Sequence, residues 1–312
     1  MTYFGENAYI GAMKRTIALF MALFATLLFP RLCGAQDYIT TAKDKALAER
    51  LLADLHEEYK ASLDAGNPME TSDLMVVAAK KLIGTPYVAG TLDEDPITEK
   101  LRIYLTKTDC IIFVETCLNL ARTVLETVEG NPSFHELASN FARTRYRKEP
   151  PYSYSDRIHY TTEWIRRQDG RLKDLTIELG GEVYDHPISF MSRHPKSYKQ
   201  LEDANSIPRA ALDLMNIEET EKELNKIPMT QIPKAKISSI GQGIKSGDII
   251  CFVSTVEGLD VAHVAIAYVE NGRVGFIHAS QNDGKVEIDE RTIDEYVSRR
   301  SNLSGIKVIR PL

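Results

Sequence analysis

Two apolar segments near the C-terminus, joined by a tight turn, constrain the fold most strongly. Residues 261–268 and 274–280 are rich in β-branched and small apolar side chains, and Asn271-Gly272 lies between them. Because Asn-Gly readily adopts the positive φ values of a two-residue hairpin turn, the sequence predicts an antiparallel strand pair in a fixed register. Similar patterns predict the other elements of this region, which are strands at 249–254, 285–288 and 305–310 and a helix near 291–299.

The predicted register places two histidines on one face of this strand pair. Counting outward from the turn puts His263 opposite Ser280 and Ala265 opposite His278, and side chains alternate between the two faces of a strand. The two imidazoles are then diagonal neighbours, roughly 7–8 Å apart between backbones and within side-chain reach. Ala265 and Ala267 share this face, and their small side chains leave room for a helix to lie against it.

A second local signal marks the start of a buried helix. Thr108 and Asp109 are suited to cap a helix, and apolar residues follow at helical spacing, at positions 111, 112, 114, 117, 118, 121, 124 and 125. Cys110 therefore lies in the first turn, at the positive end of the helix dipole. Because a thiolate is stabilised there, we expect a lowered thiol pKa and a nucleophile. The alternative is a buried core cysteine, which is common among free cysteines.

The cysteine and the two histidines together predict nucleophilic catalysis. A nucleophilic thiol needs an imidazole within hydrogen-bond reach, and the imidazole needs a third group on its other nitrogen. We assign Cys110 as the nucleophile, His263 as the base and His278 as the group that orients it. The competing interpretations are two polar residues on a half-exposed strand and a zinc site. The C-x-x-C and H-E-x-x-H spacings of zinc ligands are absent, so we expect no metal and no other cofactor.

The N-terminal residues predict a secretory signal. Met13-Lys14-Arg15 precedes the almost wholly apolar stretch 17–29, and small residues follow before Gln36. Cleavage after Ala35 gives a signal peptide at 1–35 and an exported, periplasmic protein without a membrane span. A retained anchor and a lipoprotein at Cys33 are the less favoured alternatives, and the start codon is Met1 or Met13.

The net charge argues against nucleic-acid binding, and the remaining cysteines cannot all pair with one another. The net charge is −6 and no basic run occurs, which disfavours a nucleic-acid partner. Removal of the signal leaves an odd number of cysteines, Cys110, Cys117 and Cys251, so at least one thiol is free or pairs between molecules. Cys117 and Cys251 lie within apolar segments, and we interpret both as core residues.

The stretch 131–240 has a different character from the regions around it. It follows the predicted helices at 37–62 and 71–83, and it is rich in aromatic and basic residues and proline. Aromatic rings suit sugar stacking and arginines suit carboxylates, although the same residues could pack a helical insertion. We expect a helix within 155–168 and solvent-exposed connections at 217–226 and 231–240. The candidate substrate-binding residues are Arg145, Arg147, Arg157, His159, Tyr160 and Trp164, together with Ser280 on the hairpin.

The motifs resemble those of the NlpC-type family of papain-like cysteine peptidases and amidases that cut bacterial peptidoglycan. The matching elements are the Tyr87-containing loop 84–88, Asp109-Cys110, His263-Val264-Ala265-Ile266 and His278-Ala279-Ser280, in the family's order. Two departures bear on the substrate groove: Ile111-Ile112 replaces the usual Ser-Gly, and Ala265 replaces the usual Gly.

Further motifs resemble one branch of this family, long labelled a domain of unknown function and similar to N-acetylmuramoyl-L-alanine amidases. They are Arg145-Tyr146-Arg147, Asp156-Arg157-Ile158-His159-Tyr160, Phe190-Met191-Ser192 and residues 258–263. This branch resemblance implies cleavage between the lactyl carbonyl of muramic acid and L-Ala. The wider family more often cuts the stem peptide between D-Glu and the diamino acid.

The resemblance implies an α+β, papain-like fold in a single catalytic domain over 36–312. Its core covers 71–126 and 246–310, and 131–240 is the insertion. Tyr87 and Asp109 are the candidate groups for the oxyanion and for substrate positioning, together with the Cys110 N–H. The implied partners are muropeptides, and the oligomeric state stays open. The alternatives are a D,L-endopeptidase, a non-catalytic muropeptide-binding protein and a transglutaminase-like acyltransferase.

Overall fold

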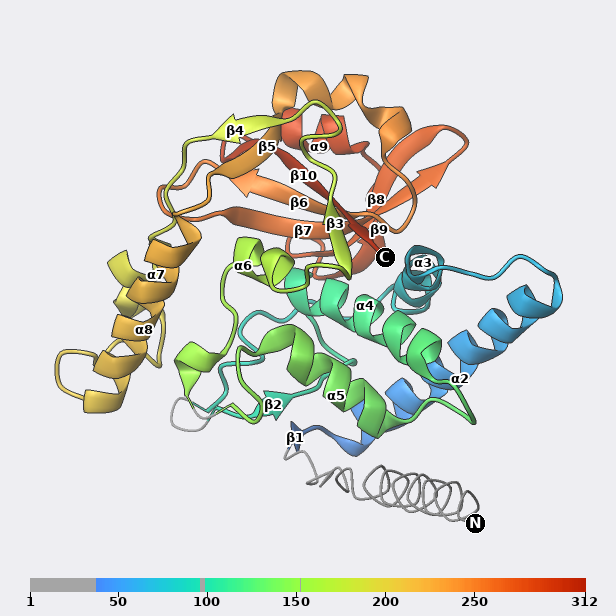
Figure 1. Cartoon of the computed structure of the whole chain (residues 1–312), viewed down its shortest axis with the longest axis horizontal. Coiled ribbons are helices and arrows are strands. Elements are labelled where there is room, and N and C mark those ends of the chain that lie inside the picture. The colour runs from blue at the N-terminus through green and yellow to red at the C-terminus, as the bar shows by residue number, and fades with distance from the viewer. Residues whose placement is uncertain (1–37, 96–98, 152) are drawn as a thin grey trace, which may run out of the picture. The chain divides into compact units, whose positions relative to one another are not determined.

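An antiparallel sheet built mainly by the C-terminal third of the chain carries the fold (Figure 1). The computed structural model describes residues 38–95, 99–151 and 153–312, so the predicted signal segment 1–35 lies outside the described residues. The strand order is β4-β5-β10-β6-β7-β8-β9, and β3 also pairs with β10. The bounds are β3 (Leu172–Asp174), β4 (Glu182–Tyr184), β5 (Met229–Pro233), β6 (Ile249–Ser254), β7 (Val261–Glu270), β8 (Arg273–Ser280), β9 (Lys285–Ile288) and β10 (Leu303–Pro311).

The hairpin of β7 and β8 has the predicted register. Asn271 and Gly272 have φ values of 51° and 77°, and Glu270 pairs with Arg273. The pairing continues in step as far as Ile266 and Ile277. Beyond that point β7 remains paired with β6, where His263 lies beside Phe252. The register set by the Asn-Gly turn is therefore confirmed as far as Ile266 and Ile277, whereas the predicted pairs His263–Ser280 and Ala265–His278 lie beyond the paired part of the hairpin.

One face of the sheet packs against the helix that begins at Cys110. This helix is α4 (Cys110–Glu126), and the Asp109 side chain caps it by accepting a 2.9 Å hydrogen bond from the Ile112 N–H. Val264, Ile266, Ile277 and Ala279 of the hairpin share one buried apolar cluster with it. The helices α2 (Ala42–Asp64), α3 (Thr71–Lys81) and α5 (Phe134–Arg145) surround α4, and the short parallel pair β1 (Tyr38–Ile39) and β2 (Leu101–Arg102) lies beside them. In Figure 1 these helices lie on the side of the sheet opposite α9.

The histidine face of the hairpin packs against a different helix. Ala265, Ala267 and Phe276 belong to a second apolar cluster together with residues of α9 (Ile293–Ser298). The small alanine side chains therefore make room for α9, while α4 covers the opposite face. Cys110 reaches the histidine side only because it stands at the very start of α4, next to the backbone of Val264.

The insertion is more ordered than the sequence pattern indicated. It holds α5, η1 (Tyr154–Asp156), α6 (Thr161–Arg166), α7 (Phe190–Arg193), η2 (Pro195–Ser197) and α8 (Pro208–Leu224), and η3 (Lys234–Ser239) and η4 (Gly241–Gly243) follow β5. The exposed connections predicted at 217–226 and 231–240 are wrong. Residues 217–224 complete α8, with Ile217 and Glu221 on its buried face, and residues 231–233 end β5, where Gln231 and Ile232 are buried.

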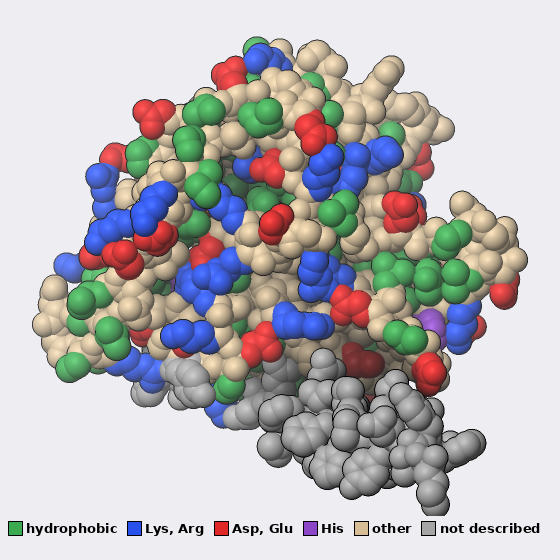
Figure 2. Space-filling view, viewed as in Figure 1, with side chains coloured by type: hydrophobic (Ala, Val, Ile, Leu, Met, Phe, Trp, Pro, Cys, Tyr) green, Lys and Arg blue, Asp and Glu red, His purple; other side chains and the backbone are tan. Residues whose placement is uncertain are grey.

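The surface carries a mixture of charges. Basic and acidic side chains are interspersed over the face shown in Figure 2, and many of them form short ion pairs such as Lys107–Glu94. In the part of the chain that the structure describes, no helix is both long and apolar enough to cross a membrane.

Candidate active site

Cys110 and His263 line one cavity of about 210 Å³ between α4, β7 and the insertion. The thiol is half-buried and lies against the backbone N–H of Val264. Its own backbone N–H, at the start of α4, has no partner within the helix, because the first N–H groups of a helix lack an acceptor four residues back. The cavity therefore places a thiol, an imidazole and a free helix end around the same space.

The environment of the thiol differs from the sequence-based expectation. Burial raises the pKa of the Cys110 thiol to about 12, the negative charge of Asp109 adds to this effect, and the N–H groups of Val264 and Ile111 only partly oppose it. The predicted lowering of the thiol pKa is therefore wrong. The physical reason is that the loss of water around the thiolate outweighs the field of the helix end. Cys110 is a neutral thiol in the resting protein.

The two histidines are in direct contact. His263 Nε2 and His278 Nδ1 are 2.8 Å apart, and the rings meet edge to face at 5.0 Å between centroids. On the far side, His278 Nε2 lies 3.3 Å from Asp289 Oδ2 and 3.9 Å from Glu287 Oε1. Asp289 is only 3% exposed. The structure thus shows a chain of contacts from His263 through His278 to Asp289, in which the last contact is at ion-pair distance without the geometry of a hydrogen bond.

Asp289 determines where the imidazole protons lie. Burial alone would raise the pKa of the Asp289 carboxyl, but two hydrogen bonds from Arg291 (2.7 and 2.6 Å) and its charge outweigh burial and hold that pKa below its usual value. An ionised carboxylate favours a proton on the nitrogen that faces it, so we place the His278 proton on Nε2. His278 Nδ1 is then an acceptor, His263 Nε2 must donate to it, and His263 Nδ1 keeps its lone pair.

Both imidazoles are neutral at neutral pH. Burial lowers the pKa of His263 to about 3, and the charge that His278 carries when protonated and the charge of Arg300 add to the effect against a weaker contribution from Asp289. Burial likewise lowers the pKa of His278 to about 4. A neutral imidazole with a free lone pair can accept a proton, which is the state that a general base requires.

Tyr87 and Asp109 belong to the loop and the helix cap that lead to Cys110, and both are close enough to the thiol to interact with it electrostatically. Residues of the Tyr87 loop pair with Thr108, since the Val88 N–H donates to the Thr108 carbonyl and the Thr108 N–H to the Pro86 carbonyl. Burial raises the pKa of the Tyr87 hydroxyl to about 12, with smaller contributions from Cys110 and Asp109. The hydroxyl therefore stays protonated and is a hydrogen-bond donor near the thiol.

The insertion residues form the wall of the cavity, with one exception. Arg145, Arg157, His159, Tyr160 and Trp164 line it, whereas Arg147 lies outside it. Arg147 instead forms a buried ion pair with Glu163 and hydrogen bonds to the carbonyl of Arg157.

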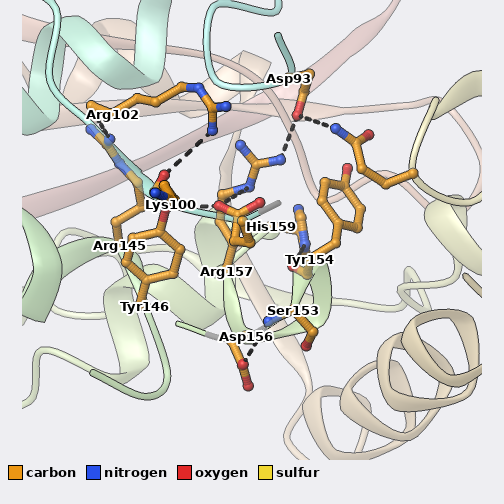
Figure 3. A network of polar contacts seen from close by, with 12 residues as sticks. Asp93, Lys100, Arg102, Arg145, Tyr146, Ser153, Tyr154, Asp156, Arg157 and His159 are labelled. Carbon is orange, nitrogen blue, oxygen red and sulfur yellow. Dashed lines mark hydrogen bonds and ion pairs between the residues drawn. The ribbon is translucent and has the colours of Figure 1, made fainter. Parts of the chain in front are cut away.

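The polar groups of this wall are largely occupied by other protein groups, and Figure 3 shows the pairing of Arg157 with Asp93. Arg145 donates to Glu115 Oε2 at 3.0 and 2.8 Å, and Arg157 pairs with Asp93. His159 Nε2 contacts the carbonyl oxygen of Tyr154 at 2.9 Å. Outside the view, the Tyr160 hydroxyl donates to Glu221 at 2.6 Å.

Two polar atoms of these wall residues have no hydrogen-bond partner in the described chain, Arg157 Nε and the indole nitrogen of Trp164. The Trp164 side chain is 3% exposed, and its indole N–H has no hydrogen-bond acceptor among the residues that the structure describes. A buried donor without an acceptor is costly. Trp164 lines the cavity, while its N–H is enclosed within the wall.

Ser280 lines a second cavity, of about 240 Å³, on the other side of His263. Its hydroxyl donates to Asp283 at 2.8 Å. The other residues that line this cavity are Ala262, His263, His278, Gln281, Asn282, Tyr296, Arg300, Asn302 and Leu303. Ala262 and His263 are shared by the two cavities.

Asp289 and Arg300 are site residues that sequence analysis missed. The position of Asp289 depends on the pairing of β8 with β9, in which His278 lies opposite Glu287, and no short turn motif announces that pairing. Within the described ranges, no three His, Cys, Asp or Glu side chains gather closely enough to hold a metal ion.

Comparison with known proteins identifies the family. Residues 77–306 match the model of the AmiA-like family, described as N-acetylmuramoyl-L-alanine amidase-like. The chain is similar to an N-acetylmuramoyl-L-alanine amidase from Bacteroides uniformis, at 30% identity and a TM-score of 0.69, with 78% of this chain and 99% of that chain covered. It is also similar to a putative xylanase from Bacteroides fragilis, at 32% identity and a TM-score of 0.67, covering 75% and 99%. No curated protein matches the chain.

A more distant structure, from Legionella pneumophila, shares the fold at 21% identity and a TM-score of 0.58, covering 86% of this chain and 97% of that chain. These findings define a mixed helix-and-sheet protein of an amidase-like, hydrolase class. The family match covers well over half of the sequence, so the chain belongs to the AmiA-like, N-acetylmuramoyl-L-alanine amidase-like family. The predicted resemblance to that branch is confirmed at the level of the family.

Proposed function

We propose that this protein is an exported cysteine amidase that cleaves the bond between N-acetylmuramic acid and L-Ala in muropeptides. The observation that carries the proposal is the contact chain from His263 through His278 to Asp289, which ends at a cavity shared with the Cys110 thiol. The family and the related amidase structures support the choice of bond. The papain-like arrangement of the NlpC-type family is part of the same proposal.

The proposed reaction begins from a neutral thiol and a neutral imidazole. As Cys110 Sγ attacks the lactyl carbonyl carbon, its proton passes to His263 Nδ1. This nitrogen is unprotonated because His263 carries its proton on Nε2, where it donates to His278. No hydrogen bond joins the side chains of Cys110 and His263 among the described contacts, so substrate closure must bring them within reach. The Cys110 N–H and the Tyr87 hydroxyl stabilise the oxyanion.

The remaining steps use the same groups. The tetrahedral intermediate collapses, the C–N bond breaks, and His263 donates its proton to the leaving amine of L-Ala. A water molecule then attacks the thioester while His263 accepts its proton, and collapse returns the Cys110 thiol and releases the free lactyl carboxylate. His278, held by Asp289, shares the positive charge that His263 carries between these steps.

Purified protein incubated with defined muropeptides tests the proposal by mass spectrometry. We expect release of an intact peptide that begins with L-Ala, and loss of that release in Cys110→Ala. Cys117→Ala is the matched control, because it removes a thiol from the same helix at a fully buried position away from the cavity. A cut within the peptide would make the protein a D,L-endopeptidase, and muropeptide binding without any product would make it a binding protein.

A further inference from the structure

The two cavities beside His263 differ in how their arginines are neutralised. In the first cavity each arginine already has a carboxylate partner: Arg145 pairs with Glu115, and Arg157 pairs with Asp93 and lies 3.8 Å from Glu99. Of these five side chains, all except Asp93 are at most 8% exposed. A substrate carboxylate entering there would compete with buried protein carboxylates, so these arginines act as wall residues rather than as free anion clamps.

The second cavity contains an arginine without such a partner. The Arg300 guanidinium stacks over the Tyr296 ring at 3.6 Å from the centroid, and in the described chain no carboxylate lies within ion-pair distance of it. Arg291 flanks the same ring at 5.0 Å but is held by Asp289. Asn282, Asn302 and Gln281 line the cavity as well, and no acidic residue does. A stacked guanidinium is preorganised to bind a planar carboxylate.

The two cavities lie on opposite sides of His263, so each is placed to hold one half of the substrate. They meet at Ala262 and His263, so a bond that reacts at this point leaves one half of the substrate on each side. In a muropeptide the muramic carboxyl is consumed in the scissile amide, and the free carboxylates belong to the peptide. On the basis of the proposed function, we propose that the second cavity is a carboxylate-binding subsite for the peptide half, with Arg300 as its charged ligand.

The assignment gives each cavity a chemically matching occupant. Arg300 pairs with the free α-carboxylate of the D-Glu that follows L-Ala, and the side-chain amides of the loop 281–282 bind the peptide backbone. The sugar half lies in the first cavity, which Trp164 lines together with the other wall residues. A bound carboxylate also offsets the charge of Arg300, which opposes protonation of His263 in the empty site.

The test compares two substrates that differ only in this carboxylate. One carries D-Glu after L-Ala and the other carries the α-amide. For the unaltered protein, we expect the amide to lower kcat/KM by roughly 10- to 100-fold, mainly through KM, since one charge-assisted hydrogen-bonded contact is lost. Arg300→Gln should lower kcat/KM for the carboxylate substrate by a similar factor and treat both substrates alike, and Arg300→Lys should keep part of the preference. Arg299→Gln, an exposed neighbour outside the cavity, is the matched control and should change nothing.

A binding measurement separates this inference from the proposed function. Calorimetry with the dipeptide L-Ala–D-Glu and with its α-amide needs no turnover. Binding of the dipeptide by the unaltered protein and by Arg299→Gln, with at least tenfold weaker binding by Arg300→Gln, supports the subsite even if no muropeptide is cut. Failure of the unaltered protein to bind the dipeptide, or a preference for the carboxylate that survives in Arg300→Gln, overturns the inference even if the amidase activity is found.

Discussion

Alkylation of Cys110 as a function of pH tests whether the proposed nucleophile rests as a neutral thiol. With a pKa of about 12, the thiol is ionised at pH 7.5 to roughly one part in 30,000, whereas an unperturbed cysteine is about one tenth ionised. If reactivity follows the thiolate fraction, iodoacetamide should label Cys110 about 3,000-fold more slowly than a free cysteine. The rate should rise about tenfold per pH unit, without a plateau below about pH 9.

The assay follows labelling by peptide mass spectrometry, which separates Cys110 from the other thiols. Cys117 and Cys251 are fully buried and should stay unlabelled in the folded protein, so they serve as internal controls. His263→Ala should keep the same slope, because burial rather than the imidazole sets the ionisation. A plateau near neutral pH that disappears in His263→Ala would refute the reasoning, since it would reveal a preformed thiolate–imidazolium pair.

Three further predictions follow from the same contacts. Asp289→Asn removes the charge that fixes the imidazole tautomers, so in a steady-state assay kcat should fall about 10- to 100-fold with little change in KM. Glu287 lies farther away, at 3.9 Å from His278, so the control variant Glu287→Gln should lower kcat much less. Glu115→Gln leaves the buried Arg145 without its carboxylate and should lower the free energy of unfolding by about 3–5 kcal/mol in urea titrations, with exposed Glu219→Gln as the control. His263 and His278 have lowered pKa values in the folded protein, so the unfolded chain binds more protons below about pH 6.5. The free energy of unfolding should therefore be highest above that pH and fall as the pH decreases toward 4. In the same urea titrations, His278→Gln should show a less steep fall.

Local signals were sufficient to predict the elements that carry the proposed catalytic groups. Asn271-Gly272 specifies a turn by its own backbone preferences, so the register of β7 and β8 follows from counting. Asp109 caps α4 through a contact only three residues away. The buried face of α8 could also have been found, since Asp213, Ile217, Glu221 and Leu224 recur at helical spacing, but the charged residues between them suggested an exposed connection.

The features that sequence analysis missed depend on contacts between distant segments. Arg145 meets Glu115 across two helices, and Arg157 meets Asp93 from a separate loop, so the sequence shows the arginines without showing that they are already neutralised. The raised pKa of Cys110 likewise depends on how completely β7 and the insertion remove water from the start of α4. Burial of this kind is a property of the assembled core, and a helix-cap motif gives only the opposing effect of the helix dipole.

Taken together, the charges suggest why the thiol can be neutral at rest and still be reactive. In the proposed mechanism, proton transfer from Cys110 to His263 creates a pair of opposite charges in a site from which water has been largely removed, and that pair must be stabilised by fixed groups. Asp289 lies at the end of the histidine chain and stabilises the positive member, and the start of α4 faces the negative one. Arg300 opposes the positive charge until a substrate carboxylate neutralises it. If both proposals hold, ionisation of Cys110 and His263 is coupled to occupation of the proposed peptide subsite, which would protect the thiol from reaction when that subsite is empty.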